Sequence, residues 1–170
     1  MVKLTSVDYL VVHCSGTPPE LDTVDAMYLD RVHRGFGWRK IGFHLVIKRD
    51  GTVQRGRVET EAGQHLRGFD DRSLSVCLIG GLHASESYVR RGRTLRKPWP
   101  DYTDAQLSSL RSVLDGWTVR HPSARVMGHS DAKRGRCCPC FDVGRWYHGG
   151  ELVPEQSAPM AGGYIPGEPL

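Results

Sequence analysis

Four short runs of apolar residues, rich in β-branched side chains, recur along the chain between polar residues and glycines. Runs of this length and composition are typical of buried strands. After the second run, Asp50-Gly51 is a strong hairpin-turn signal, and we expect a return strand to begin at Thr52. The four predicted strands cover residues 9–13, 41–47, 75–79 and 124–127.

Two other segments repeat apolar residues at the spacing of an amphipathic helix. Thr23 is the expected N-cap of the first, which ends at Gly35. The second begins after Thr103, and Gln106 three residues later completes a capping box. Strands that alternate with helices predict an α/β fold, here a single domain with a central mixed β-sheet flanked by α-helices. The apolar stripe of the second helix consists of Leu107, Leu110, Val113, Leu114 and Trp117.

The composition is that of an ordinary globular domain. The chain has 170 residues, of which 39% are hydrophobic and 25% charged, and this argues against a disordered chain. No apolar run approaches the ~18 residues of a membrane span or forms a signal-peptide core near the start. We therefore expect a domain over residues 1–148, made in the cytoplasm without an export signal, and a Pro- and Gly-rich C-terminal extension over residues 149–170.

Positive charge is concentrated in residues 82–100, which we expect to form a loop. Five basic residues stand there against the single acid Glu86, in a chain with a formal net charge of +4. Such a segment could bind nucleic acid, an anionic cell envelope or an acidic protein partner. A solvent-exposed loop without a partner is an equally good interpretation. The basic residues are Arg90, Arg91, Arg93, Arg96 and Lys97.

Histidines and cysteines gather near the predicted strand ends. His13 and His129 each follow a short strand, which is where α/β folds place their sites. Three of the five cysteines follow at positions 137, 138 and 140, and without a signal peptide we expect reduced thiols or metal ligands. Two histidines and a thiolate can form a zinc site with an open position for water; ordinary polar strand-end residues are the alternative. Cys14 and Cys77 are expected to be small buried apolar residues.

Five motifs occur in an order that is similar to one known family. Together they resemble the zinc-dependent N-acetylmuramoyl-L-alanine amidases of the type 2 family, among them the lysozymes of short-tailed coliphages and, more distantly, the peptidoglycan recognition proteins. The resemblance extends from about Leu10 to Trp146. The motifs are Val12-His-Cys-Ser-Gly-Thr17, Gly42-Phe-His-Leu-Val-Ile-Lys-Arg-Asp-Gly-Thr-Val53, Ser75-Val-Cys-Leu-Ile-Gly-Gly81, Gly128-His-Ser-Asp131 and Cys138-Pro-Cys-Phe-Asp142.

The resemblance implies a set of Zn²⁺ ligands. In that family the metal is held by a histidine of the first strand, a histidine in a Gly-His motif and a cysteine before Pro-x-Phe-Asp. These positions match His13, His129 and Cys138. The chain carries one extra residue between His129 and this cysteine, so Cys137 and Cys140 compete for the third position. A structural cysteine-rich zinc site is a further alternative, but no second cysteine pair at the usual spacing is present elsewhere.

The chain departs from the family at two catalytic positions. The family's tyrosine, whose hydroxyl lies near the zinc-bound water, is replaced by Phe43, which has no hydroxyl. The family's oxyanion-stabilising lysine is matched by Arg136, with Lys133 as the alternative, and arginine keeps the charge without acting as a proton donor. His65, in a segment that resembles the family's substrate groove, is expected to hold the muramyl-peptide or assist proton transfer; an exposed loop histidine is the alternative.

The function implied by the resemblance is that of a phage-type endolysin. Such an enzyme hydrolyses the amide bond between N-acetylmuramic acid and L-alanine with a zinc-activated water. It waits in the host cytoplasm until a holin opens the membrane. Phe43 motivates the alternative, a non-catalytic peptidoglycan-binding module of the same fold. We expect a monomer with peptidoglycan as substrate, no membrane span and no nucleic-acid partner. A polymerase partner, known for some close relatives, has no independent support in the sequence.

Overall fold

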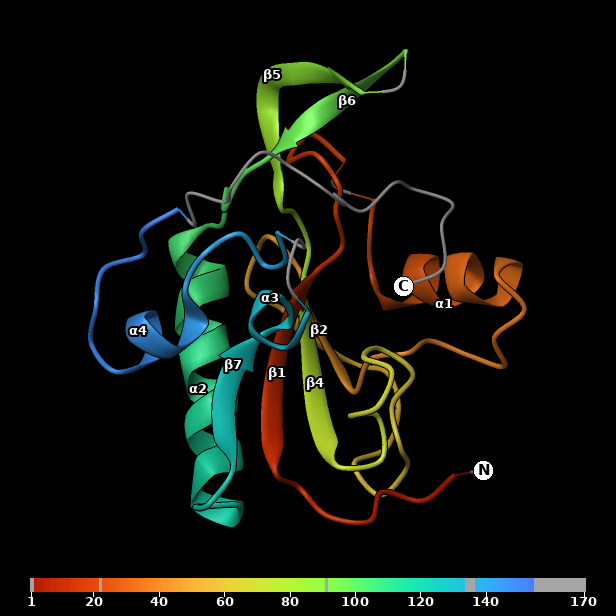
Figure 1. The fold of residues 1–170 in the computed structure, drawn as a ribbon, viewed down its shortest axis with the longest axis vertical. Helices are drawn as coiled ribbons and strands as arrows, with labels where there is room; N and C mark the ends of the chain where they lie inside the picture. The colour runs from red at the N-terminus through yellow and green to blue at the C-terminus, as the bar shows by residue number, and fades with distance from the viewer. Residues whose placement is uncertain (1, 22, 91, 134–136, 155–170) are drawn as a thin grey trace.

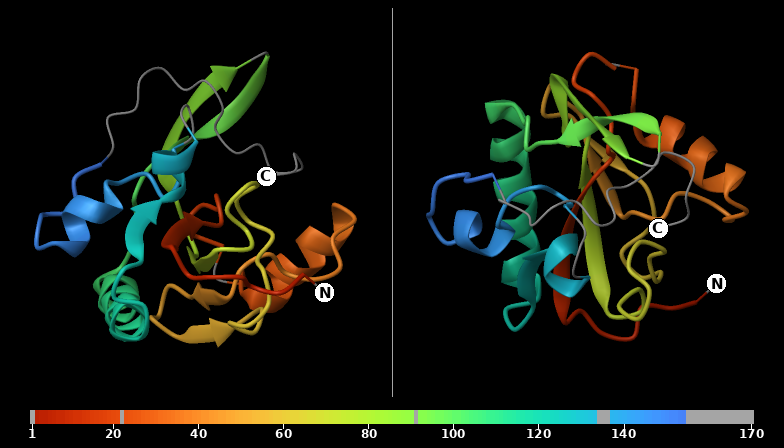
Figure 2. Two further views of the ribbon diagram at one scale, coloured as in Figure 1. Left: turned by 60° about the horizontal axis from the view of Figure 1, so that its bottom comes forward. Right: turned by 45° about the horizontal axis from the view of Figure 1, so that its top comes forward.

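A five-stranded sheet lies at the centre of the molecule, with helices on both sides and a hairpin that projects from one end (Figures 1 and 2). The computed structural model describes residues 2–21, 23–90, 92–133 and 137–154. In chain order the elements are β1 (Tyr9–Cys14), α1 (Ala26–Gly35), β2 (Leu45–Ile47), β3 (Val53–Arg55), β4 (Ser73–Leu78), β5 (Leu82–Arg90), β6 (Arg93–Pro98), α2 (Asp104–Arg120), β7 (Arg125–Gly128), α3 (His129–Ala132) and α4 (Val143–Tyr147).

The order of the central sheet is β3-β2-β4-β1-β7. β1 pairs in parallel with β4 and β7, and β2 pairs in parallel with β4. β3 is antiparallel to β2, which it joins through the predicted turn at Asp50-Gly51. The predicted class, a single α/β domain with a mixed sheet and flanking helices, is confirmed. Because β1 and β7 are parallel neighbours, their carboxyl ends meet at one edge of the sheet.

Alternating side chains give the sheet two buried faces. On one face, Val12 of β1 and Val76 of β4 belong to the same core as Leu110 of α2. On the other face, Cys77 of β4 belongs to a second core with Leu29 of α1. Cys77 is thus buried, as predicted. α2 and α1 therefore cover opposite faces of the sheet, and each helix contributes its apolar stripe to a different core (Figure 1).

The two long helices differ in how well their starts were predicted. In α2, Thr103 Oγ1 accepts the N–H of Gln106 at 3.1 Å and the Gln106 side chain accepts the N–H of Thr103 at 3.2 Å, which is the predicted capping box. α1 instead begins at Ala26, because the carboxylate of Asp25 caps it by accepting the N–H of Tyr28 at 2.7 Å. The predicted N-cap at Thr23 is therefore wrong by two residues.

The basic segment 82–100 forms a hairpin of β5 and β6 and not the predicted loop (Figure 1). Its strands are mostly exposed, so the alternation of buried and exposed residues that marks a strand is weak there. Two of its charges are paired. Lys97 Nζ lies 2.7 Å from a carboxylate oxygen of Glu86, and Arg96 lies 2.8 Å from Glu20.

The chain after α4 returns to the domain, where Phe141 and Pro154 form an isolated β-bridge. Residues 155–170, Arg91 and Arg136 lie outside the described residues. The boundary at 148 and the extension over 149–170 therefore stay predictions. Within the part of the chain that the structure describes, no helix is both long and apolar enough to cross a bilayer.

Candidate metal centre

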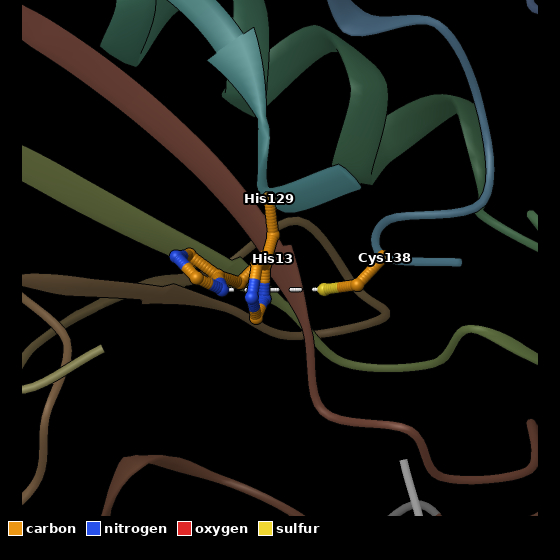
Figure 3. A group of neighbouring side chains, drawn as sticks. All are labelled: His13, His129 and Cys138. Atoms are coloured by element: carbon orange, nitrogen blue, oxygen red, sulfur yellow. Dashed lines mark hydrogen bonds between the residues drawn. The ribbon is translucent and has the colours of Figure 1, made fainter. Parts of the chain in front are cut away.

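Three side chains with metal-binding atoms converge from distant parts of the chain (Figure 3). One such atom from each of His13, His129 and Cys138 lies within 4.8 Å of the others. The sulfur of Cys138 is 4.0 Å from Nδ1 of His13. A tetrahedral ion with bonds of about 2.0 Å to nitrogen and 2.3 Å to sulfur separates its ligands by roughly 3.3 to 3.6 Å. The group is slightly wider than this, and small side-chain movements would close it around one ion. Two imidazoles and a thiolate suit zinc.

The ends of two neighbouring strands place the histidines. His13 is the next-to-last residue of β1, and His129 follows β7 as the first residue of α3. The register pairs Val12 with Gly128, so the two histidines leave the same edge of the sheet with ring centroids 4.8 Å apart. The carboxylate of Asp131 accepts the N–H of Gly128 at 2.8 Å and fixes the turn from strand to helix. Both imidazoles are buried.

Cys138 reaches the histidines from a loop that is fastened at two points. Its carbonyl accepts the N–H of Ser130 at 2.9 Å. The next carbonyl, of Pro139, accepts the hydroxyl of Tyr102 at 2.8 Å. These bonds tie the loop to α3 and to the segment before α2, so the position of the sulfur depends on the tertiary fold.

The two competing cysteines are placed differently. The Cys140 thiol is buried and donates to the carbonyls of Gly81 at 3.6 Å and Cys137 at 3.0 Å. Neither Cys137 nor Cys140 belongs to the histidine group found among the described residues. The structure therefore brings Cys138 to the two histidines, despite the extra residue in the preceding loop.

Cys14 was predicted to be a buried apolar residue, which is wrong: it is partly exposed and contacts the sulfur of Cys138. Its backbone N–H donates to that sulfur at 3.2 Å and its thiol donates at 3.6 Å. The backbone N–H donor favours the thiolate form of Cys138, which is the form that binds metals. The hydrogen bond between the two thiols lowers the pKa of Cys14, and the same bond together with burial raises the pKa of Cys138. The one sequence feature that could have indicated this contact is that Cys14 directly follows His13 at the end of a strand.

His65 lies beside His13 in the interior. Its side chain is fully buried, so the alternative of an exposed loop histidine is wrong. Its Nδ1 is 3.0 Å from Nε2 of His13. Burial lowers the pKa of both imidazoles well below the ordinary value, and both rings are therefore neutral near pH 7. A neutral imidazole is the form that binds a metal.

Phe43 also lies next to His13. The two ring centroids are 5.1 Å apart, and the phenyl ring is only 2% exposed. The residue precedes β2, which is shorter than the predicted strand over residues 41–47. Its ring packs in the apolar core on the α1 side of the sheet. The matched family position is thus beside the candidate metal ligand His13, but without a hydroxyl.

The predicted cationic residue near the site is only partly described. Arg136 lies outside the described residues. Lys133, the alternative, ends α3 with an exposed side chain, and its backbone N–H donates to the carbonyl of His129 at 3.2 Å. Lys133 thus lies four residues after the candidate ligand His129, with its side chain exposed to solvent.

A cavity of about 550 Å³ opens beside the cluster. Its lining includes Cys14 and Cys137, Leu29 and Val32 of α1, and Leu95 of the β5–β6 hairpin. None of the three candidate ligands lines this cavity or a larger one of about 760 Å³. The smaller cavity adjoins the cluster through Cys14, whose N–H donates to the sulfur of Cys138.

The chain is similar to known proteins over most of its length. Residues 3–141 match the family described as N-acetylmuramoyl-L-alanine amidase (Amidase_2). The chain is 35% identical over 151 residues to the endolysin of Klebsiella phage KP32, covering 89% of this chain and 92% of the relative. It is also 35% identical over 148 residues to the endolysin of Escherichia phage T7, covering 87% and 90%.

A solved structure shares the fold. The N-acetylmuramoyl-L-alanine amidase LysC from Clostridium intestinale URNW superimposes with a TM-score of 0.63 at 22% identity, over 79% of this chain and 76% of that chain. The two proteins therefore share the arrangement of the sheet and helices. From the family match and the phage relatives together, it follows that the chain belongs to the N-acetylmuramoyl-L-alanine amidase family.

Proposed function

We propose that this chain is an endolysin that hydrolyses the amide bond between the lactyl group of N-acetylmuramic acid and L-alanine in peptidoglycan, with one Zn²⁺ held by His13, His129 and Cys138. The observation that carries the proposal is the convergence of these three side chains at the edge of the sheet, in a chain of the amidase family. The endolysin relatives match along nearly their whole length, which supports the same role.

The residues present fit such a metal and its chemistry. Three protein ligands leave a fourth position, where a bound zinc supplies a water of lowered pKa and polarises the amide carbonyl. The N–H of Cys14 holds the sulfur of Cys138 in place for the metal. Arg136 is proposed to offset the negative charge that develops on the carbonyl oxygen. The cavity lined by Cys14 is proposed to hold the stem peptide, because Cys14 contacts the sulfur of Cys138.

The place of action follows from the same role. We propose that the protein accumulates in the host cytoplasm and reaches the cell wall after a holin opens the membrane. Its relatives are endolysins of phages, which supports this sequence of events. Cells that express the protein should stay intact until the inner membrane is permeabilised, and should then lyse.

Phe43 favours a second candidate function. A binding module of the same fold would keep the groove and the metal but lack hydrolysis, and a phenyl ring beside His13 supplies no hydroxyl for proton transfer. General acid–base help is worth about 10²–10⁴ in rate, so its loss alone slows an amidase without removing the water activated by a metal. The two candidates differ in whether the wild-type protein releases new amino termini.

The test is the release of L-alanine amino groups from purified peptidoglycan by a matched pair of cysteine variants. We expect activity in the wild type, none in Cys138→Ser, and largely unchanged activity in Cys140→Ser, because the Cys140 thiol is outside the candidate ligand group and donates to the carbonyls of Gly81 and Cys137. Zinc analysis of each protein accompanies the assay. A wild type that binds zinc but is inactive would favour the binding module. Activity in Cys138→Ser and none in Cys140→Ser would show that the third ligand is misassigned.

A further inference from the structure

The imidazole of His13 presents its two nitrogens to different neighbours. Nδ1 faces the sulfur of Cys138, at 4.0 Å, and Nε2 faces Nδ1 of His65, at 3.0 Å. A neutral imidazole has one N–H and one lone pair, and only the lone pair binds a metal. His13 therefore offers its lone pair to the ligand cluster only when the proton is on Nε2. Whether the proton of His13 is on Nε2 depends on the hydrogen bond to His65.

The protonation of His65 is in turn decided by a serine of β4. The hydroxyl of Ser73 donates its single proton to the carbonyl of Phe69 at 2.7 Å. Nε2 of His65 lies 3.2 Å from the same hydroxyl oxygen. Since the proton of Ser73 is already used, this oxygen accepts, and Nε2 of His65 is the donor. In the neutral ring, Nδ1 of His65 then carries a lone pair and accepts from His13.

The surroundings of His65 keep the ring in this position. The carboxylate oxygen of Asp70 accepts the backbone N–H groups of His65 and Leu66 at 2.7 and 2.8 Å, and lies 4.0 Å from Nε2. Gly63 leaves room for the imidazole, since a Cβ there would lie 2.7 Å from its Nε2 and still nearer to Cδ2. The side chain is fully buried and does not reach the groove that substrate would enter.

We propose that His65 is a positioning residue, which fixes the tautomer and orientation of His13 so that Nδ1 points its lone pair at the metal. The hydrogen bonds run in one direction, from His13 to His65, from His65 to Ser73 and from Ser73 to the carbonyl of Phe69. This inference rests on the proposed metal site. In this inference His65 acts by orienting His13, and it does not contact the muramyl-peptide.

The tautomers can be read without metal or substrate. Two-bond ¹⁵N–¹H spectra of the metal-free protein, labelled in histidine, distinguish a proton on Nε2 from one on Nδ1. We expect Nε2–H in both His13 and His65. A proton on Nδ1 of His65 would overturn the inference, because that nitrogen would then donate to His13.

Zinc affinity gives the second readout, by competition with a chromophoric chelator. Removing a group that orients a metal ligand typically costs 10–100-fold in affinity, so His65→Leu should raise the zinc Kd by about that factor. His65→Asn places an amide oxygen where Nδ1 was, and should recover most of the loss. Thermal unfolding of the metal-free variants checks that each is folded. Ser73→Ala tests the same chain of bonds if His65→Leu does not fold, with an expected loss of several-fold.

The outcomes separate this inference from the proposed function. A wild type that takes up one zinc, together with His65→Leu of unchanged affinity, would overturn the role of His65 and leave the metal site intact. Equal losses in His65→Leu and His65→Asn would also contradict it, because the acceptor would then be irrelevant. A wild type that binds no zinc would overturn the proposed function itself.

Discussion

His33 couples the protonation of one side chain to the stability of the fold. The ring is 3% exposed, and its Nδ1 accepts the N–H of Gly42 at 2.9 Å. Burial lowers the pKa of His33 to about 4. The unfolded chain takes up this proton near pH 6.5. The stability that the neutral ring contributes is therefore complete above that pH and is lost as the pH falls toward 4.

We expect this residue alone to lower the free energy of unfolding by about 2 kcal/mol between pH 7 and pH 5. His33→Asn keeps an acceptor for Gly42 but does not titrate, so its unfolding free energy should vary less with pH by that amount. Urea unfolding at the two pH values measures the difference. A wild-type pH dependence in His33→Asn would contradict the account.

Phe43→Tyr restores the hydroxyl that the family carries beside the metal ligands. The phenyl ring lies 5.1 Å from the ring of His13, so the new hydroxyl enters the immediate surroundings of the site. If proton transfer limits the rate, we expect a gain in kcat of up to ~10²-fold at unchanged zinc content. Amine release from peptidoglycan measures it. An unchanged rate would show that another group already transfers the proton.

The residues of the site were predictable to the extent that each carries its own local signal. His13 and His129 follow recognisable strands, and Cys138 precedes a short motif. The bonds of Cys14 to Cys138 and of His65 to His13 join residues 124 and 52 positions apart. No local pattern encodes such contacts, because they exist only once the strands have paired.

At the level of elements, the capping box of α2 joins the helix to the rest of the domain. Thr103 Oγ1 accepts the N–H of Gln106 and donates to the carbonyl of Arg49 at 2.7 Å. Thr103→Ala removes both bonds and should lower the free energy of unfolding by about 1–2 kcal/mol. Thr103→Ser keeps the hydroxyl and should lose little. Urea denaturation of both variants tests this, and equal losses would show that the methyl group, not the hydroxyl, is what matters.

Elements with strong local signals were predicted well, and those without them were not. The apolar run of β1 and the capping box of α2 are both found where expected. The start of α1 was misplaced because two polar residues, Thr23 and Asp25, are both suitable caps, and the carboxylate of Asp25 is the one that accepts the N–H of Tyr28. The β5–β6 hairpin was missed because pairing between its own strands, and not burial, holds it together.

At the scale of the whole molecule, the parallel pairing of β1 with β7 creates the candidate metal centre. It places residues 13 and 129 side by side, and the loop after α3 adds residue 138. None of these segments forms the site alone. Activity should therefore depend on the folded domain and on the metal together, and the two requirements can be separated by removing the metal alone.

The most direct measurement is a titration of the metal-free protein with Zn²⁺ while amine release from purified peptidoglycan is followed. The account predicts no release without metal, a linear rise in rate up to one zinc per chain, and no further rise beyond it, because the described residues bring together one group of two histidines and one cysteine that is proposed to bind the ion. Full activity in the metal-free protein, or a rate that does not respond to zinc, would contradict it.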